Sequence, residues 1–282
     1  MSKLNVLSVF DGLGGAKIAL DELRYECNYY SSEIDEYAIK VHKSNYDDTI
    51  HLGDIKNIKS KDLPKIHLLI GGSPCQNLTM AGDKKGLDGE KSSLFFEYVR
   101  LKKELNPKYF LLENVASMKN VERDKISELM GVQPVKINSA DFTAQNRNRY
   151  YWTNITIDEF EKCNVILKDV LEDIDDFHLS KKHHQAFLKS YNWKPTDING
   201  KSKVLMASYY KQPPHAPYIE CKASESGFRM LSPVECERLQ GIPDNYTNYV
   251  SKTQRYKMIG NGFTIPVIKH LLKNIKQKTR LT

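Results

Sequence analysis

Short runs typical of buried strands alternate with amphipathic segments along the first half of the chain. The runs are five or six residues long, and apolar residues recur at helical spacing in the segments between them. The pattern predicts strands at residues 5–10, 29–33, 66–70, 109–113, 134–138 and 149–153, and helices at residues 16–23, 36–43, 94–105 and 123–130. This alternation predicts an α/β fold built on a doubly wound, mostly parallel sheet.

The alternation stops near residue 155. Basic and aromatic clusters follow, such as KKHH at 181–184 and YYKQPPHAPY at 209–218, and they indicate a separate small lobe. Ser232 and Pro233 then open a helix that runs through Leu239, because serine is a good N-cap and proline suits the first helical turn. A final helix is predicted at 265–276. We expect three parts, at residues 1–154, 155–228 and 229–282, the last of which returns to the first.

The composition is that of a folded globular protein, with 40% hydrophobic and 27% charged residues. The longest apolar run, residues 66–70, is far shorter than the roughly 18 residues of a membrane span, so we expect no membrane association. The N-terminus lacks the pattern of an export signal, and the five cysteines contain no C-x-x-C pair, which is typical of a cytoplasmic protein. A net charge of +7 favours a polyanionic partner such as nucleic acid, although solubility alone explains it equally well.

A glycine-rich turn, Phe10–Gly15 (FDGLGG), joins the first strand to the first helix. Such a turn lets a ligand approach the backbone, and the helix N-terminus favours acidic groups. Glu33 ends the second strand, 18 positions after Gly15, near the spacing at which a carboxylate binds ribose hydroxyls. The pattern is not G-x-G-x-x-G, so we infer an adenosyl ligand smaller than a dinucleotide. The alternative is an ordinary tight turn.

Asp54 and Ile55 follow a third strand region. The carboxylate suits the amino group of adenine and the aliphatic side chain suits its ring, although an ordinary strand-end turn explains the pair better when it is taken alone.

A cysteine and a carboxylate follow neighbouring strands. Cys75 stands in GGSPCQ after the fourth strand, and the next segment carries glycines and lysines, which predict a mobile lid over a phosphate backbone. Glu113 ends the fifth strand. Both side chains are therefore expected at the carboxyl edge of the sheet, above the adenosyl site. The alternative for Cys75 is a small buried hydrophobic residue.

Arg147 and Arg149 stand two positions apart in QNRNR. On an extended segment they share one face, where they suit an anion or the catalytic carboxylate. The alternative is a solvated edge strand.

Together these motifs resemble the cytosine-5 DNA methyltransferases. FDGLGG, SPCQ, ENV, QNRNR, RMLSPVECERLQGIPDNY and MIGNGFTIPVI occur in the order of that family, from about Val6 to Leu272, excepting the variable stretch 155–228. VLSVFDG, IGGSPC and IPVIKHL are most similar to the catalytic domain of the animal de novo methyltransferases. The chain lacks their chromatin-reading domains, so we expect a stand-alone bacterial or phage enzyme.

The resemblance implies a Rossmann-like fold that uses S-adenosyl-L-methionine, with a catalytic and cofactor-binding domain at 1–154 and a target-recognition lobe at 155–228. It implies methyl transfer to carbon 5 of a flipped-out cytosine in a short duplex DNA sequence, through a covalent cysteine adduct. The catalytic candidates are Cys75, Glu113, Gln145, Arg147 and Arg149. The cofactor candidates are Phe10, Leu13, Gly15, Glu33, Asp54, Ile55, Pro74 and Asn261. The DNA-binding candidates are Gln76, Thr79, Lys84, Lys91, Lys181, Lys182, Ser208, Tyr209, Lys211 and Gln212, of which those at 208–212 follow from side-chain polarity, with packing of the lobe by Tyr209 and Tyr210 as the alternative.

One position departs from the family pattern: many members have Asp two positions before the Phe of the first motif, where this chain has Ser8, which implies a weaker cofactor contact. Three rival functions remain. A transfer RNA methyltransferase would carry a Cys-Phe-Thr tripeptide, which the chain lacks; a catalytically silent homologue would not keep Cys75 and Glu113; and a cysteine hydrolase would need an activating partner for the thiol. We expect a monomer that binds double-stranded DNA and no metal, in a bacterial cell or a phage-infected host, with a cognate restriction endonuclease as a candidate partner.

Overall fold

The computed structural model describes residues 3–74, 94–190 and 193–275 of the chain. These residues divide into two compact units. Unit 1 takes the chain up to residue 137, residues 148–159 and the chain from residue 267 onward. Unit 2 takes residues 138–147 and 160–266. No helix within the described ranges is long and apolar enough to span a membrane.

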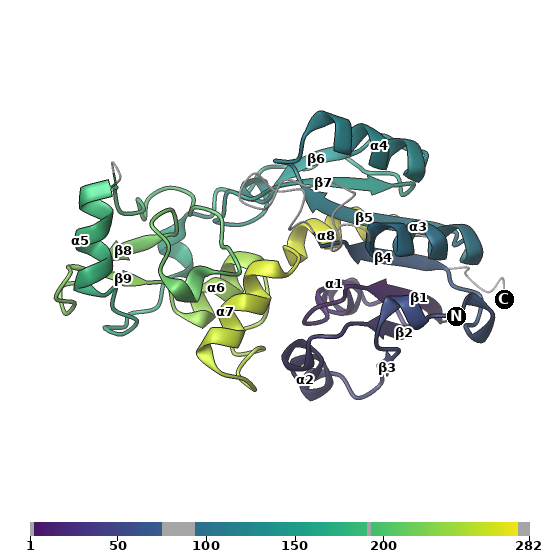
Figure 1. Ribbon diagram of the computed structural model, residues 1–282, viewed down its shortest axis with the longest axis horizontal. Helices are drawn as coiled ribbons and strands as arrows, with labels where there is room; N and C mark the ends of the chain where they lie inside the picture. The colour runs from purple at the N-terminus through teal and green to yellow at the C-terminus, as the bar shows by residue number, and fades with distance from the viewer. Residues whose placement is uncertain (1–2, 75–93, 191–192, 276–282) are drawn as a thin grey trace. The chain divides into compact units, whose positions relative to one another are not determined.

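Unit 1 is built on a seven-stranded sheet (Figure 1). Its strands are β1 (Leu4–Val9), β2 (Cys27–Ser32), β3 (Ile50–His51), β4 (Leu68–Gly72), β5 (Tyr109–Val115), β6 (Val135–Asn138) and β7 (Asn148–Thr153). They lie in the order β3-β2-β1-β4-β5-β7-β6. The strands from β3 to β5 pair in parallel, and β7 pairs antiparallel to β5. The prediction of a mostly parallel α/β sheet is confirmed.

The helices of unit 1 follow the strands in alternation. They are α1 (Gly15–Glu22), α2 (Glu36–Asn45), α3 (Leu94–Leu105), α4 (Asn120–Met130) and α8 (Ile265–Leu272). The bounds of α3 are those predicted, whereas α4 begins three residues before its predicted start at 123. Asp35 fixes the start of α2, because its side chain accepts hydrogen bonds from the amides of Tyr37 and Ala38.

The core of unit 1 lies around its central strands. Val6, Leu7 and Val9 of β1 are fully buried, as are the apolar residues Leu68–Ile70 of β4. Central parallel strands are covered on both faces, which is why they are continuous apolar runs in the sequence. Trp152 of β7 is also fully buried, and its indole N–H donates to the hydroxyl of Ser127 in α4 at 2.9 Å.

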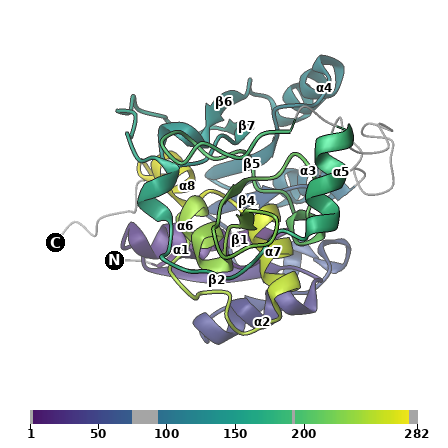
Figure 2. The same cartoon turned by 90° about the vertical axis from the view of Figure 1, so that its left-hand side faces the viewer.

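Unit 2 contains three α-helices and a two-stranded antiparallel sheet within the described residues. The helices are α5 (Lys181–Ser190), α6 (Pro233–Gln240) and α7 (Lys252–Asn261), and the strands are β8 (Tyr218–Glu220) and β9 (Phe228–Met230). Within this unit, α6 and α7 pack together and α5 lies apart from them in both views (Figures 1 and 2). Ser232 caps α6 as predicted, since its hydroxyl accepts from the amide of Glu235 at 3.1 Å.

The division of the chain differs from the expected one within residues 1–154, since residues 138–147 belong to unit 2, and again at the C-terminal side. Both α6 and α7 belong to unit 2, and only the chain from residue 267 onward returns to unit 1. A buried ion pair at 2.7 Å between Arg229 and Glu235 ties α6 to β9 in unit 2. In unit 1, the hydroxyl of Tyr25 donates to the carbonyl of Ile275 at 2.8 Å, and Lys269 of α8 pairs with Glu22 of α1.

Candidate active site

The order of the strands reverses next to β1. From β1 the chain builds the sheet outward through β2 and β3, and it then returns to add β4 and β5 on the other side of β1. Ligands of open α/β sheets bind at such a reversal, beyond the carboxyl ends of the strands. The segments that follow β1, β2 and β4 carry the candidate residues, so the topology brings the predicted site to one edge of the sheet.

The segment Phe10–Gly15, which we call the β1 loop, has an unusual backbone. Phe10 has a φ of 56°, in a region that costs an L-residue about 1–2 kcal/mol. At Gly12, with a φ of 59°, an added Cβ would meet no atom within 4 Å, so open space borders the loop at this position. At Gly14, an added Cβ would lie 2.8 Å from Nδ1 of His42. The loop therefore has room for a ligand beside Gly12, whereas the ring of His42 fills the space beside Gly14.

Glu33 follows β2 and is held by backbone amides. Its Oε2 accepts from the amide of Gly12 in the β1 loop at 2.8 Å. Its Oε1 accepts from the amides of Ile34 and Asp35 at 2.8 and 2.9 Å. These contacts fix the carboxylate beside the β1 loop, where the sequence predicted a partner for ribose hydroxyls.

Ile34 is a residue that the sequence reasoning missed. Its side chain is 68% exposed immediately after Glu33. An apolar residue directly after an acidic strand end is the signal that would have found it, since such a side chain offers surface for a flat ring.

A buried carboxylate lies behind the β1 loop. Asp11 is 4% exposed, and its Oδ1 accepts from the hydroxyls of Ser8 at 2.5 Å and Tyr29 at 2.6 Å. Its Oδ2 accepts from the hydroxyl of Ser31 at 2.7 Å and lies 2.9 Å from Nδ1 of His42. From the sequence, Asp11 was identified only as part of the glycine-rich turn.

Burial acts to raise the pKa of Asp11, but the hydrogen bonds and the charge of His42 outweigh it and hold that pKa below its ordinary value. The folded state therefore favours the carboxylate over the acid. This stabilisation is present above the ordinary pKa of aspartate and is lost as the pH falls through the lowered pKa. Burial and the neighbouring Asp11 raise the pKa of Tyr29 well above its usual value, so its hydroxyl keeps the proton that it donates.

The other cofactor candidates differ in their exposure and in the unit to which they belong. Asp54 caps the short helix Ile55–Asn57 through the amide of Lys56, and the hydroxyl of Ser32 donates to the carbonyl of Gly53 at 2.7 Å, which ties this segment to β2. The side chains of Leu13 and Ile55 are 1% and 4% exposed and pack in the interior. Gly15 begins α1. Asn261 is exposed at the end of α7 in unit 2, and its role at the cofactor stays a prediction.

The predicted catalytic carboxylate has the predicted arginine beside it. Nε of Arg149 lies 2.6 Å from Oε1 of Glu113, and both side chains are 14% exposed. The register of β5 and β7 explains the pair: Glu113 faces Tyr151 and Val115 faces Arg149, so the two charged residues are diagonal neighbours across the antiparallel ladder. The pair is oriented by the ladder and still accessible from solvent.

The expectation that Arg147 and Arg149 share one face is wrong. Arg147 precedes β7 and belongs to unit 2, where its guanidinium donates to the carbonyls of Leu205, Gly260 and Gly262 at 3.0–3.2 Å. These carbonyls, which are far along the chain, bind a side chain that local spacing assigned to an anion or the catalytic carboxylate. Arg147 thus joins distant segments within unit 2, and a catalytic role for it stays a prediction.

Gln145 is also used within unit 2. It is fully buried, its amide oxygen accepts from the amide of Leu205 at 2.8 Å, and its amide nitrogen donates to Gln240 at 3.3 Å. A catalytic role for Gln145 stays a prediction.

Asn114 positions the turn that follows β4. Its side-chain nitrogen donates to the hydroxyl and the carbonyl of Ser73 at 3.0 and 3.3 Å, and its oxygen accepts from the amide of Val115. Pro74 follows directly. The nucleophile candidate Cys75 and the DNA-binding candidates Gln76, Thr79, Lys84 and Lys91 lie outside the described residues. Asn114 thereby links the ends of β4 and β5, a role that its place in the ENV motif alone did not reveal.

The DNA-binding candidates of unit 2 divide into exposed and buried side chains. Lys181 and Lys182 are exposed on α5, and Lys211 is exposed with its ammonium 5.6 Å from the ring centre of Tyr210. Tyr209 is 1% exposed, and its hydroxyl donates to the carbonyl of Pro217. Of the aromatic pair that the alternative assigned to packing of the lobe, Tyr209 is packed in the interior, whereas Tyr210 is 36% exposed.

Ser208 and Gln212 flank these residues. Ser208 is half-buried directly before the short helix Tyr209–Lys211. The amide group of Gln212 accepts from the amide of Ser180 at 3.3 Å and donates to the carbonyl of His178 at 3.4 Å. Gln212 thus anchors its own loop, and base recognition by it stays a prediction.

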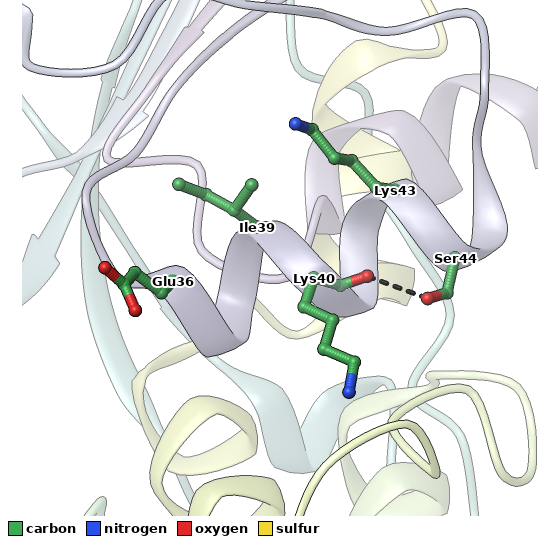
Figure 3. A pocket seen from close by; sticks show the side chains of 5 residues that line it. All are labelled: Glu36, Ile39, Lys40, Lys43 and Ser44. Carbon is green, nitrogen blue, oxygen red and sulfur yellow. Dashed lines mark hydrogen bonds between the residues drawn. The ribbon is translucent and has the colours of Figure 1, made fainter.

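A pocket on the surface of α2 is lined by Glu36, Ile39, Lys40, Lys43 and Ser44 (Figure 3). All five side chains come from one helix, and none is a candidate of the predicted site. No group of three or more potential metal ligands occurs in the part of the chain that the structure describes.

Comparison with known proteins identifies the family. The family described as C-5 cytosine-specific DNA methylase matches residues 4–192 and 135–277. The chain belongs to this family. Members of it transfer a methyl group to carbon 5 of cytosine in DNA through a covalent cysteine adduct, and the family and its fold imply the use of S-adenosylmethionine. The chain is therefore a DNA cytosine-5 methyltransferase.

Individual relatives agree with this assignment. The chain is 32% identical to Type II methyltransferase M1.ScrFI of Lactococcus lactis subsp. cremoris, over 95% of this chain and 76% of the relative. It is 28% identical to Type II methyltransferase M.FnuDI of Fusobacterium nucleatum, over 97% and 94%. It is 34% identical to Orphan methyltransferase M.Rho11sI of Bacillus phage rho11s, over 71% of this chain and 43% of that protein.

Solved structures support the fold. The methyltransferase EhMeth of Entamoeba histolytica matches with a TM-score of 0.78 and 16% identity, covering 97% of this chain and 98% of that one. The Dnmt2 methyltransferase of S. pombe matches with a TM-score of 0.74 and 18% identity, covering 96% and 97%.

Proposed function

We propose that the methyltransferase reaction takes place at the carboxyl ends of β1, β2, β4 and β5, with Cys75 as the nucleophile and Glu113 as the group that binds the target base. The observation that carries this proposal is the 2.6 Å contact between Arg149 and Glu113 at the end of β5, adjacent to the strand that leads into Cys75. An arginine that orients a carboxylate at this edge is what recognition of a planar, hydrogen-bonding base requires.

Carbon 5 of cytosine is a poor nucleophile, so the reaction needs an activated base. The Cys75 thiolate adds to carbon 6, and the new C–S bond leaves electron density at carbon 5. Glu113 binds ring nitrogen 3 and the exocyclic amine, and a proton shared between its carboxyl group and nitrogen 3 offsets the negative charge that the adding thiolate brings into the ring. S-adenosylmethionine, when bound, supplies an electrophilic methyl group. Loss of the carbon 5 proton and expulsion of the Cys75 thiolate then restore the ring.

The residues around the β1 loop fit an adenosyl ligand. The open space at Gly12 admits the ligand, Glu33 retains acceptor capacity for ribose hydroxyls, and Ile34 offers exposed apolar surface beside them. Pro74 and the Phe10 backbone border the same edge of the sheet. A flipped-out cytosine would enter from duplex DNA, since its ring atoms are not reachable inside a base-pair stack.

The substrate class is tested by supplying purified protein with tritium-labelled S-adenosylmethionine and either plasmid DNA or bulk transfer RNA. We expect label in the DNA. Label in the transfer RNA alone would favour the RNA methyltransferase instead, and label in neither would favour the silent homologue.

Sequence recognition is assigned to the exposed part of the 208–212 loop. Lys211 projects to solvent beside Tyr210, whereas Tyr209 and Gln212 hold the loop in place. We expect Lys211→Ala to relax discrimination at one base pair by about 1–3 kcal/mol, as the loss of a contact to a base edge does. Sequencing that maps methylated cytosines measures it. Lys222→Ala, at another exposed lysine of unit 2, is the control, and an equal change in its pattern would contradict the assignment.

Backbone binding is assigned to α5. Each phosphate contact contributes about 0.9 to the slope of log K against log salt concentration, so Lys181→Ala with Lys182→Ala is expected to lower that slope by about 2 for every DNA sequence. Titration of labelled duplexes at several salt concentrations measures it. The matched control replaces two exposed lysines of unit 1, Lys59 and Lys61, and should leave the slope unchanged. The same slope in the α5 variant and in the wild type would exclude these lysines as phosphate ligands.

We further propose a monomer that acts on double-stranded DNA in the cytoplasm of a bacterium or a phage-infected host. The names of the curated relatives support this setting, since they are Type II methyltransferases of bacteria and an orphan methyltransferase of a phage. A cognate restriction endonuclease is the partner that a Type II enzyme would have.

A further inference from the structure

We propose that Asp11 is a positioning residue of the cofactor site: its buried carboxylate fixes the β1 loop and, through the amide of Gly12, sets the orientation of Glu33. The inference rests on the proposed function, because it takes Glu33 as the group that binds the ribose of S-adenosylmethionine. Asp11 itself is 4% exposed and both of its oxygens are engaged, so it acts through the loop and not on the ligand.

A turn such as the β1 loop does not need a buried charge. Removing a carboxylate from water is unfavourable unless partners replace the water. Here four partners from three elements converge on it: Ser8 from β1, Tyr29 and Ser31 from β2, and His42 from α2. Ser8 and Ser31 face each other in the register of β1 and β2, so the pairing of the strands presents both hydroxyls together. The carboxylate therefore joins the loop to three elements at one point.

The backbone of the β1 loop connects Asp11 to Glu33. The peptide unit between Asp11 and Gly12 carries the N–H that donates to Oε2 of Glu33 at 2.8 Å. The amide of Asp11 donates to the carbonyl of Ser32 at 3.2 Å, and its carbonyl accepts from the amide of Gly14 at 3.1 Å. A shift of Asp11 thus moves the donor that orients the carboxylate of Glu33.

The ring of His42 packs against the β1 loop on the side of α2. Its Nδ1 lies 2.9 Å from Asp11, and its Nε2 is 2.9 Å from the hydroxyl of Thr49. A Cβ at position 14 would overlap this ring, which accounts for glycine there beyond its φ of 88°. The ring leaves the loop no room to relax toward α2, so the contacts of Asp11 determine where the loop lies.

The network includes Ser8, the position that departs from the family pattern. The family resemblance places a carboxylate at the position of Ser8, whereas here the serine hydroxyl donates to a carboxylate three residues later. Although burial acts to raise the pKa of Asp11, His42, Ser8 and Tyr29 stabilise the charged form and hold that pKa below its ordinary value. Negative charge thus remains behind the first strand, supplied from within the loop.

Two matched tyrosine variants test the proposal. Tyr29→Phe removes one hydroxyl that donates to Asp11, and Tyr25→Phe removes a hydroxyl that donates to the carbonyl of Ile275, away from the loop. Both variants lose one phenolic hydroxyl in unit 1, and that of Tyr25 also lies within 3.3 Å of the carbonyls of Leu272 and Lys273. Isothermal titration with S-adenosylhomocysteine measures the dissociation constant, and the melting temperature is measured for each protein.

We expect Tyr29→Phe to raise the dissociation constant roughly tenfold, because a hydrogen bond to a charged group is lost. We expect Tyr25→Phe to leave the constant unchanged, whatever its melting temperature. A purely structural role for the network would lower the melting temperature of both variants and change neither constant. Asp11→Asn should show a larger loss than Tyr29→Phe; if that protein does not fold, the tyrosine pair still decides the question.

A double variant tests the route through Glu33. If Asp11 acts through that carboxylate, Tyr29→Phe should add little to the loss caused by Glu33→Gln, so the effects are less than additive. Fully additive effects of the two substitutions on the dissociation constant would overturn the route through Glu33. Equal dissociation constants for Tyr29→Phe and the wild type would overturn the positioning role of Asp11. A wild-type protein that does not bind S-adenosylhomocysteine would overturn the proposed function itself, which separates the two failures.

Discussion

Cys75→Ser is expected to abolish methyl transfer while DNA binding persists. The thiolate is the attacking species, and a serine hydroxyl at neutral pH is not ionised and is a far weaker nucleophile. Cys75 follows Pro74 at the end of β4, so the substitution changes one atom at the predicted point of attack. Transfer of labelled methyl groups to DNA measures the loss, and a gel-shift titration measures the binding.

A mechanism-based trap and a cysteine control complete this experiment. DNA with 5-fluorocytosine at the target should form a stable adduct with the wild type and none with Cys75→Ser, because fluorine at carbon 5 prevents the proton loss that releases the thiolate. Cys163→Ser, at a half-buried cysteine of unit 2, should keep both activity and adduct. Methylation by Cys75→Ser at the wild-type rate would end the covalent account.

Glu113→Gln is expected to lower the turnover rate by roughly 2–4 kcal/mol in activation free energy, or about 30- to 1,000-fold. Glutamine keeps the shape of the side chain, but its amide cannot share a proton with ring nitrogen 3 to offset the charge that the adding thiolate brings, and it leaves Arg149 without its ion-pair partner at 2.6 Å. Single-turnover methylation measures the chemical step.

An ion pair of the same kind supplies the control. Glu97 and Arg100 pair at 2.8 Å on α3 and are about one-third exposed. Glu97→Gln should change the rate little, since an exposed pair contributes about 1 kcal/mol or less even to stability. An unchanged rate in Glu113→Gln would show that the Glu113 carboxylate is structural.

The sequence predicted those features that depend on neighbouring residues. The continuous apolar run of β4 and the bounds of α3 follow from local periodicity. The contact of Arg149 with Glu113 follows from the pairing of β5, which ends at this edge of the sheet, with the antiparallel strand β7, which begins there. The position of Glu33 beside the glycine-rich turn follows from the regular spacing between such a turn and the next strand end, and its contact with ribose stays a prediction.

Features that depend on distant residues were not predicted. The carbonyls that bind Arg147 belong to Leu205, Gly260 and Gly262, which no local pattern connects to QNRNR. The helix α7 was missed because its buried residues include the charged Arg255, which pairs with Glu237 at 3.1 Å. The role of Asp11 requires the pairing of β1 with β2 and the position of α2, neither of which its motif shows.

The central claim is methyl transfer to carbon 5 of cytosine in DNA. Its most direct test is to incubate unmethylated plasmid with the purified protein and S-adenosylmethionine, digest the DNA to nucleosides and identify the product by mass spectrometry against synthetic standards. The account predicts 5-methyl-2′-deoxycytidine that is absent without cofactor. Formation of N4-methyl-2′-deoxycytidine or N6-methyl-2′-deoxyadenosine in its place would contradict the account.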